Sequence, residues 1–205
     1  MSMDYSVIVI GGGHAGIEAA WAAANALGSS GGRVALVTMD PARLGTMSCN
    51  PAIGGLAKGQ IVREIDALGG VMGRIADATG IMFKMLNTSR GAAVRGPRCQ
   101  NDKEAYRLEA QRLLAGHPSI DVLAGTVDDF LTVERDGTRL VEGVRIPAGS
   151  GTVAWDGAGY ASEPRRPNRD AVELRAGAVV LTTGTFMRAL MHVGDRRAEG
   201  GRIGE

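Results

Sequence analysis

The chain has 205 residues, of which 44% are apolar and 22% are charged, and its formal net charge is +1. This composition is typical of a globular chain with one sizeable core, and it excludes a disordered or a fibrous protein. The longest apolar stretch with helical periodicity, Ile17 to Leu27, is interrupted by Glu18 and Asn25 and is much shorter than the roughly 20 residues that span a bilayer. The amino terminus has neither the basic region nor the long apolar core of a secretory signal. We therefore predict a cytoplasmic protein without membrane spans.

The amino-terminal residues predict a strand, a helix and a second strand. Tyr5 to Ile10 is a short β-branched apolar run that ends in three glycines, as a buried parallel strand would. His14 to Leu27 is rich in alanine and favours a helix, and Gly28 occupies the position of a C-cap glycine. Arg33 to Thr38 is typical of another buried strand. A unit of this size predicts a parallel pair of strands joined by a right-handed crossover.

The middle of the chain alternates between irregular and periodic patterns. Asp40 to Gly59 is rich in Gly, Pro, Asn and Ser without a period, which indicates a long functional loop. Gln60 to Leu68 has apolar residues at helical spacing, and Asp102 to Leu114 shows a further helical pattern. Asp121 to Ala124 and Val127 to Val133 then return to strand-like content.

The carboxyl-terminal part predicts an antiparallel meander followed by one more parallel strand. The pair Asp136-Gly137 lies between two apolar runs and indicates a type I′ hairpin turn. Pro147 to Asp170 is rich in Gly, Pro and Arg and has no period, so we expect an extended surface loop. Val172 to Leu174 continues the meander, and Ala178 to Thr182 is typical of a buried parallel strand.

Positive charge is concentrated in the segment from Lys84 to Arg112. Seven basic residues stand there against three acidic ones, a local charge of +4 that leaves about −3 for the remainder. Such asymmetry is typical of a surface that meets a polyanion, and also of a solvated helix face with ion pairs. Both interpretations stay open. The basic residues are Lys84, Arg90, Arg95, Arg98, Lys103, Arg107 and Arg112.

The two cysteines, Cys49 and Cys99, are far apart in the sequence, show no CxxC spacing and have no histidine nearby. This pattern predicts neither a metal site nor a disulfide framework. Any role of these residues is therefore expected to come from the free thiols.

Gly11, Gly13 and Gly16 form the pattern GxGxxG between a predicted strand and a predicted helix, the context of a dinucleotide-binding turn. The first glycine permits the tight turn, the second lets the backbone approach a pyrophosphate, and the third lets the helix pack on the strand. The helix amino terminus adds unpaired N–H groups and a partial positive charge. An acidic ribose ligand does not end the second strand, where Thr38 stands and Asp40 follows two residues later. The ribose ligand and the choice between NAD and FAD stay open at this point.

The strand from Val179 to Gly184 resembles the one by which the chain of two-domain flavoproteins returns past the cofactor. Together with the meander, it favours an FAD domain over an NAD dehydrogenase, in which strands and helices would alternate. We predict an α/β fold: a Rossmann-like FAD-binding domain over residues 1–205, with a parallel sheet and an antiparallel β-meander. The glycine-rich end, Gly200 to Glu205, indicates that the domain is truncated here.

Five blocks, GGGHAGIEAA, MSCNPAIGG, AKG, VREIDALGG and LTTGTF, occur in this order across nearly the whole chain. They resemble the MnmG (GidA) family of transfer-RNA wobble-uridine modification enzymes. The chain departs from the family pattern in a lengthened segment from Gly28 to Gly32, in the inserted loop from Pro147 to Asp170, and at Cys99, which lies outside these blocks.

The resemblance implies an FAD-dependent enzyme that builds an aminomethyl or carboxymethylaminomethyl group on C5 of the wobble uridine of certain transfer RNAs. It implies a homodimer that forms a heterotetramer with an MnmE-type GTPase, methylenetetrahydrofolate as the carbon source, and NADH to reduce the flavin. The family's nicotinamide-binding and helical RNA-binding parts would lie beyond Glu205. The alternatives are a related folate- and FAD-dependent transfer-RNA uridine methyltransferase, and a truncated nucleotide- or RNA-binding module without turnover.

The resemblance also assigns roles to single residues. Cys49 is expected to be a catalytic thiol that adds to C6 of the uridine and raises the electron density at C5; the alternative is a small packed residue. His14 is expected either to donate to the pyrophosphate or the flavin, or to fill a half-exposed position of the turn. The main-chain N–H and C=O of Val127, on a strand after the third helix, would contact the adenine edge. The expected FAD-binding residues are Gly11, Gly12, Gly13, His14, Ala15, Gly16 and Val127, and no metal ligand is expected.

Overall fold

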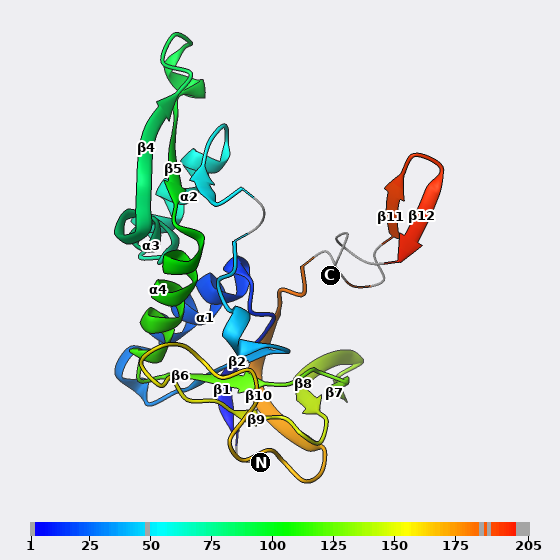
Figure 1. The fold of residues 1–205 in the computed structure, drawn as a ribbon. Coiled ribbons are helices and arrows are strands. Elements are labelled where there is room, and N and C mark those ends of the chain that lie inside the picture. The colour runs from blue at the N-terminus through cyan, green and yellow to red at the C-terminus, as the bar shows by residue number, and fades with distance from the viewer. Residues whose placement is uncertain (1–2, 48–49, 185–186, 188–189, 200–205) are drawn as a thin grey trace.

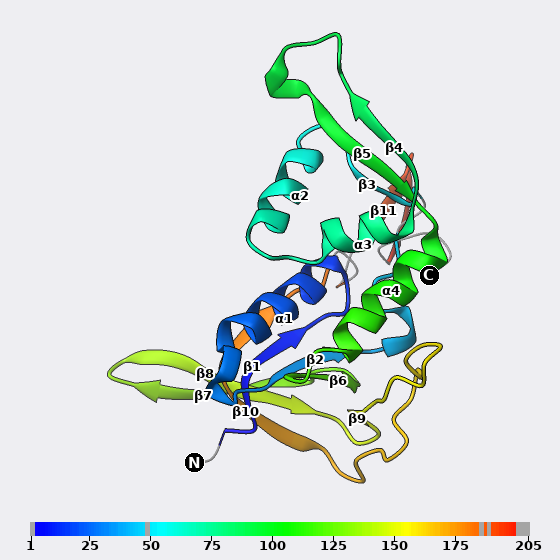
Figure 2. The ribbon, with the colours of Figure 1, turned by 90° about the vertical axis from the view of Figure 1, so that its left-hand side faces the viewer.

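The main sheet has seven strands in the order β7-β8-β10-β1-β2-β6-β9. Helices α1 (His14–Leu27) and α4 (Lys103–Ala115) cover one face of this sheet, and a smaller lobe projects beyond them (Figures 1 and 2). None of the helices among the described residues is long and apolar enough to cross a membrane. The computed structural model describes residues 3–47, 50–184, 187 and 190–199.

The predicted strand, helix and strand form at the amino terminus. β1 (Tyr5–Ile10) and α1 begin and end at the predicted residues, and β2 (Val34–Thr38) begins one residue later than predicted. The two strands run parallel, with Val9 opposite Leu36. Both of these side chains pack with α1 and α4, whereas Ile8 on the opposite face packs with the meander. Because both faces are buried, the apolar run of β1 is continuous rather than alternating.

One strand, β10 (Val172–Leu181), belongs to both parts of the main sheet. Its first half pairs antiparallel with β8 (Thr138–Ile146), where Leu174 lies opposite Val144. Its second half runs parallel to β1. The sequence predicted two separate segments here, and the structure joins them into one strand that links the meander to the Rossmann-like part.

The meander contains the predicted hairpin between β7 (Asp129–Arg135) and β8. Asp136 and Gly137 have φ angles of 50° and 72°. Positive φ at both central residues confirms the type I′ turn, whose twist matches that of the flanking strands.

The expected position of Val127 on a strand was wrong. β6 (Ile120–Ala124) ends before Gly125, whose φ is 155°, and β7 begins only at Asp129. Val127 therefore lies in the connection, half-buried against the core on the meander side. Its β-branched side chain extended the strand-like pattern of the sequence beyond the strand itself.

The segment 147–170 was expected to be a surface loop, and this expectation was wrong in part. β9 (Gly151–Thr152) pairs antiparallel with β6, so the segment adds an edge strand to the main sheet. Ser150, Val153 and Tyr160 are buried. Because exposed residues and glycines separate these side chains, no regular period marks their burial in the sequence.

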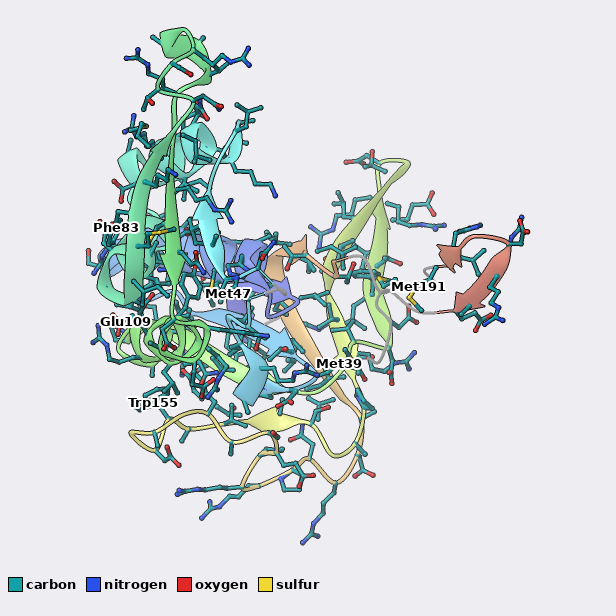
Figure 3. The ribbon with its side chains drawn as sticks, turned by 45° about the horizontal axis from the view of Figure 1, so that its top comes forward. Met39, Met47, Phe83, Glu109, Trp155 and Met191 are labelled. Carbon is teal, nitrogen blue, oxygen red and sulfur yellow. The ribbon has the colours of Figure 1, made fainter. Side chains whose placement is uncertain are left out.

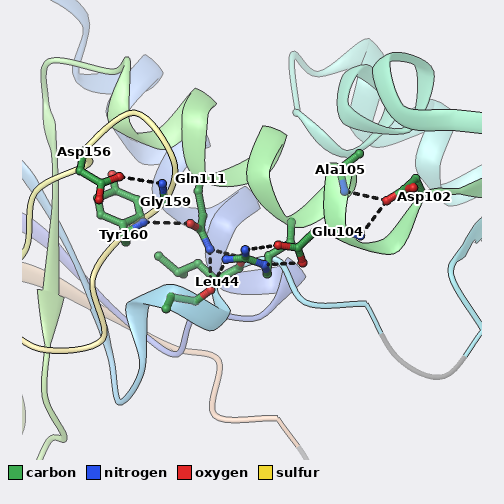
Figure 4. A network of polar contacts seen from close by, with 10 residues as sticks. Leu44, Asp102, Glu104, Ala105, Gln111, Asp156, Gly159 and Tyr160 are labelled. Atoms are coloured by element: carbon green, nitrogen blue, oxygen red, sulfur yellow. Dashed lines mark hydrogen bonds and ion pairs between the residues drawn. The ribbon is translucent and has the colours of Figure 1, made fainter.

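A buried amide on α4 holds this segment in place (Figure 4). Gln111 accepts a hydrogen bond from the Tyr160 N–H at 3.1 Å and donates to the carbonyl oxygens of Ala42 and Leu44 at 2.8 and 3.2 Å. The Gly45 N–H donates in turn to the Gly12 carbonyl. Gln111 thereby ties the segment 147–170 to the loop that packs on the glycine turn.

The smaller lobe contains a three-stranded antiparallel sheet in the order β3-β5-β4, and its strands were not predicted. β4 and β5 form a hairpin that projects away from the main sheet (Figure 2). A separate hairpin of β11 (Leu190–Val193) and β12 (Arg196–Glu199) follows β10 (Figure 1). The elements of the lobe are β3 (Ala52–Gly54), α2 (Lys58–Ala67), α3 (Met72–Thr79), β4 (Gly80–Leu86) and β5 (Gly96–Asn101).

Both helices predicted in the middle of the chain are present. α2 begins two residues before the predicted Gln60 and ends one residue before Leu68. α4 begins after its N-cap, Asp102, whose carboxylate accepts hydrogen bonds from the N–H groups of Glu104 and Ala105 at 3.0 and 2.8 Å. These bonds satisfy donors that have no partner within the helix.

Candidate functional site

The turn from β1 into α1 packs against the end of β10. The Gly11 N–H donates to the Val37 carbonyl at 2.9 Å, and Gly11 has a φ of 114°, which favours glycine. A Cβ at Gly11 would overlap the carbonyl oxygen of Thr182. The Thr182 hydroxyl donates to the carbonyl oxygens of Ile10 at 2.8 Å and Gly11 at 3.2 Å. The chain at the end of β10 therefore reaches the glycine turn through Thr182.

The glycines of the turn meet different surroundings. A Cβ at Gly16 would overlap the Gly11 carbonyl oxygen, and one at Gly12 would lie 2.6 Å from side-chain atoms of Leu44 and Thr38. A Cβ at Gly13 would meet nothing within 4 Å. Three of the glycines are thus required by packing, whereas Gly13 faces open space.

The open space at Gly13 adjoins the amino terminus of α1. Gly13 is the N-cap residue, no side chain caps this end, and no acidic residue stands in the first turn. The N–H groups of His14, Ala15 and Gly16 have no acceptor within the helix. These donors and the helix dipole favour an anion such as a pyrophosphate at this position.

His14 is half-buried at the first position of α1. Its ring centroid lies 5.5 Å from that of Tyr106, and its Nε2 is buried without a hydrogen-bond partner among the described residues. Burial lowers the pKa of His14 from its ordinary value of 6.5, so the imidazole is neutral at pH 7. Its unpartnered nitrogen is free to pair with a bound group.

A cavity of about 280 Å³ lies between this end of α1 and the smaller lobe. His14 and Met47 line it from the main part of the chain, and Ile53, Lys58 and Ile65 line it from the lobe. The walls are mainly apolar, and Lys58 is the one lysine or arginine among the described lining residues. An apolar cavity with a few polar groups is typical of a site for a flat organic ligand.

The structure describes one of the two cysteines, Cys99. Cys49, the expected catalytic residue, lies outside the described residues. Cys99 on β5 is buried, its Sγ lies 3.4 Å from the Ala76 carbonyl oxygen, and burial raises its pKa. A protonated, enclosed thiol is a packing residue rather than a nucleophile.

The ribose ligand stays open. The Asp40 carboxylate accepts a hydrogen bond from the Ala42 N–H at 3.1 Å and so caps the short helical turn Pro41–Arg43. This local contact uses one oxygen of Asp40, and the hydroxyl of Thr38 lies beside Gly12.

The basic segment from Lys84 to Arg112 divides into two parts. On α4, Arg107 pairs with Glu104 and Arg112 pairs with Glu109, which agrees with the interpretation of a solvated helix face. Lys103 is the first residue of α4. The other four basic residues lie on the β4–β5 hairpin and form no ion pair within the described part of the chain: Lys84, Arg90, Arg95 and Arg98.

Comparison with known families decides where the chain belongs. The profile of the family described as glucose inhibited division protein A (GidA) matches residues 6–205. The chain belongs to the GidA family. Relatives in this family agree over nearly the whole chain, although it spans only 28% of their length.

Two relatives and one solved structure illustrate this agreement. The tRNA uridine 5-carboxymethylaminomethyl modification enzyme MnmG of Granulibacter bethesdensis is 48% identical over 98% of this chain and 28% of its own length. The enzyme of the same name from Rhodopirellula baltica is 45% identical over the same shares. Aquifex aeolicus GidA is 43% identical, with a TM-score of 0.74 over 98% of this chain and 28% of its own.

A more distant structure shares the fold alone. An adenosine-5-phosphosulfate reductase is 19% identical to this chain, with a TM-score of 0.51 over 90% of this chain and 31% of its own. The predicted α/β fold, with a largely parallel central sheet and antiparallel additions, is thus confirmed by both close and distant structures.

Two residues of α1 that sequence reasoning did not select join the glycine turn to the smaller lobe. The Glu18 carboxylate accepts from the Met72 N–H at 2.6 Å and from the Val71 N–H at 3.1 Å, at the start of α3. The Trp21 indole N–H donates to the Gly69 carbonyl at 3.1 Å. Glu18 and Trp21 are three positions apart and so share one helix face. A polar and an aromatic side chain on one face of an alanine-rich helix is the signal that would have pointed to this contact.

Proposed function

We propose that this chain is the FAD-binding part of an enzyme that modifies C5 of the wobble uridine of transfer RNA. Support comes from the GidA family membership and from the names of its relatives, tRNA uridine 5-carboxymethylaminomethyl modification enzymes. The observation that carries the cofactor assignment is the open space at Gly13, beside uncapped N–H donors and between tightly packed glycines. A diphosphate fits this arrangement because it supplies the missing acceptors.

The residues of the turn would hold the cofactor at its diphosphate. Gly11, Gly12 and Gly16 shape the backbone, Gly13 leaves room, and the N–H groups of His14 and Ala15 donate. The neutral His14 ring would face the cofactor from the cavity wall, and the main chain of Val127 would contact the adenine. FAD supplies the redox chemistry of the site when it is bound.

Cys49 would act as the nucleophile toward the uridine. A thiolate that adds to C6 breaks the C5–C6 double bond and leaves electron density at C5, where the new carbon substituent attaches. Loss of the C5 proton and departure of the thiolate from C6 would then restore the uracil ring. The assignment rests on the residue's place in the MSCNPAIGG block of the GidA family.

The finer parts of the proposal concern the full-length protein. We expect a cytoplasmic homodimer that works with an MnmE-type GTPase in a heterotetramer. Methylenetetrahydrofolate would provide the carbon atom, and NADH the reducing equivalents. Support for these points comes from membership of the GidA family.

A matched pair of glycine substitutions tests the cofactor site in the full-length protein. Gly13 and Gly91 are both N-cap residues with negative φ, −76° and −59°, and a Cβ at either would meet nothing within 4 Å. Gly13→Val is expected to lose bound flavin because the branched side chain fills the diphosphate position. Gly91→Val should keep it. Equal flavin absorbance of the two purified variants would contradict the proposal.

The catalytic thiol is tested by Cys49→Ser, with Cys99→Ala as the control. Cys49→Ser should retain flavin and lose uridine modification, measured by nucleoside analysis of transfer RNA from cells that lack the native enzyme. Cys99→Ala should remain active, with at most a modest loss of stability. Normal modification by Cys49→Ser would remove the catalytic role and leave the flavin assignment unaffected.

A further inference from the structure

The β4–β5 hairpin carries positive charge and has no acidic residue of its own. From Gly80 to Asn101 the sequence contains four basic residues and no acidic one. Lys84 lies directly opposite Arg98 in the register of the two strands. Like charges at such a pair repel each other and destabilise a sheet. A bound anion between the two cations would reduce this repulsion.

Hydrogen bonds hold the backbone of the hairpin that carries these charges. The side chain of Gln60 on α2 donates to the carbonyl oxygens of Ala93 and Arg95, each at 3.3 Å. The Asn87 side chain donates across the tip to the Val94 carbonyl at 3.0 Å. The positions of Arg90 and Arg95 are thus set by hydrogen bonds on the hairpin and to α2.

Exposed apolar side chains accompany the cations on the same hairpin. The Phe83 side chain is 60% exposed, and Met82 and Met85 are exposed beside it. Phe83 lies on β4 at the border of the molecule (Figure 3). Cationic residues with an exposed aromatic ring among them are the combination by which proteins bind single-stranded nucleic acid, phosphates to the cations and bases to the ring.

A second cavity, of about 420 Å³, lies at the base of the hairpin. Phe83, Lys84 and Arg98 line it from the hairpin, and Asp66 and Asp77 line it from the two helices. The aromatic ring suits a nucleobase, and the carboxylates can accept hydrogen bonds from its amino or imino groups. The cavity therefore adds a place for one unpaired base beside the cationic strand pair.

We infer that the β4–β5 hairpin and the cavity at its base bind single-stranded RNA next to the nucleotide that is modified. This inference rests on the transfer-RNA substrate proposed above, and it names the part of this chain to which that RNA binds. The phosphates pair with Lys84, Arg90, Arg95 and Arg98, and an unpaired base stacks on Phe83. A second copy of the chain is a poorer occupant, because two such hairpins would place cations against cations.

The test compares two pairs of exposed arginines in the full-length protein. Arg90 and Arg95 lie on the hairpin, whereas Arg165 and Arg166 lie on the segment 147–170 at the opposite end of the molecule (Figure 1). The probe is a fluorescent anticodon stem-loop with a wobble uridine, and its anisotropy is followed at several salt concentrations. Arg90→Ala with Arg95→Ala should weaken binding about tenfold at low salt and reduce the slope of log Kd against log salt by about 1.5. Arg165→Ala with Arg166→Ala should change neither.

A third variant separates stacking from charge. Phe83→Leu should weaken binding about fivefold or more without changing the salt slope. Equal behaviour of the two arginine pairs, in a protein that binds the stem-loop, overturns the hairpin assignment alone. A full-length protein that retains flavin but binds no stem-loop overturns the proposed substrate as well. A hairpin variant whose oligomeric mass changes together with its RNA affinity overturns the assignment in favour of a protein interface.

Discussion

The main sheet and the smaller lobe differ in how far their strands are buried. β1 is buried on both faces, with Ile8 and Val9 fully enclosed, whereas β4 leaves Ile81 67% exposed and Phe83 60% exposed. The main sheet is stabilised by its own apolar contacts. The lobe buries Val71, Ile75 and Cys99 in the core, whereas its β4–β5 hairpin leaves apolar and cationic side chains exposed. The two regions thus differ in how much apolar surface their strands leave exposed.

The largest effect is expected in the main sheet, at Gly16. Gly16→Val should cost more than about 4 kcal/mol of unfolding free energy, because its side chain would overlap the Gly11 carbonyl in a backbone that cannot move away. Gly13→Val, in the same turn, should cost less than about 1 kcal/mol since space is open there. Urea unfolding of the flavin-free variants measures both values. Similar losses at the two positions would mean that the turn is not held by packing.

The sequence predicted the main sheet better than the lobe for a physical reason. β1 and α1 are set by local patterns, a β-branched run, a glycine turn and an alanine-rich helix, which can be recognised without tertiary contacts. β4 shows no alternation, because apolar side chains lie on both of its faces, and β5 contains Gly96 and Pro97. These strands exist because they pair with each other and pack on α2 and α3, and such contacts leave no short-range pattern.

The next effect concerns the joint between α4, the loop after β2 and the segment 147–170. Gln111→Ala should cost about 2 to 3 kcal/mol, because it leaves the Tyr160 N–H and the Leu44 carbonyl without their partner. The Ala42 carbonyl loses one of its two donors and keeps Arg107. Hydrogen exchange should then rise at Tyr160 while β1 stays protected. Unchanged exchange at Tyr160 would show that β9 alone holds the segment.

The contact between the two regions should give a smaller effect. Glu18→Gln keeps one acceptor oxygen but removes the charge at the start of α3, so a loss of about 1 kcal/mol is expected. Glu109→Gln, which breaks a surface pair with Arg112, is the matched control and should cost less than about 0.5 kcal/mol. If Glu18 joins the regions, amide exchange should accelerate in α3 and not in β1. Equal exchange in the two variants would contradict that role.

The strand and helix boundaries around the candidate site were predicted, and the roles of its residues stay predictions. The glycine turn lies between β1 and α1 at the predicted residues, and β10 ends at Leu181, one residue before the predicted Thr182. The cavity beside His14 was not foreseen, because its other wall comes from the lobe. Met47 and Ile65 line the same cavity but are far apart in the sequence, so no short-range pattern indicates that they are neighbours.

The smallest effect is expected from His14, at the border of the two regions. Burial lowers the pKa of its imidazole below 6.5, so the folded state resists a proton that the unfolded chain accepts. The unfolded state therefore binds more protons below pH 6.5, and the free energy of unfolding falls as the pH is lowered through this value. The decrease attributable to His14 is confined to the acid side, and above pH 7 the residue adds no pH dependence. Urea unfolding of the flavin-free protein at several pH values, with His14→Asn for comparison, measures this decrease. The two curves should diverge on the acid side, and parallel curves would show that the unfolded and folded states bind the His14 proton equally. A steeper acid loss in the variant would instead mean that the imidazolium is stabilised at the start of α1, where the helix dipole opposes it.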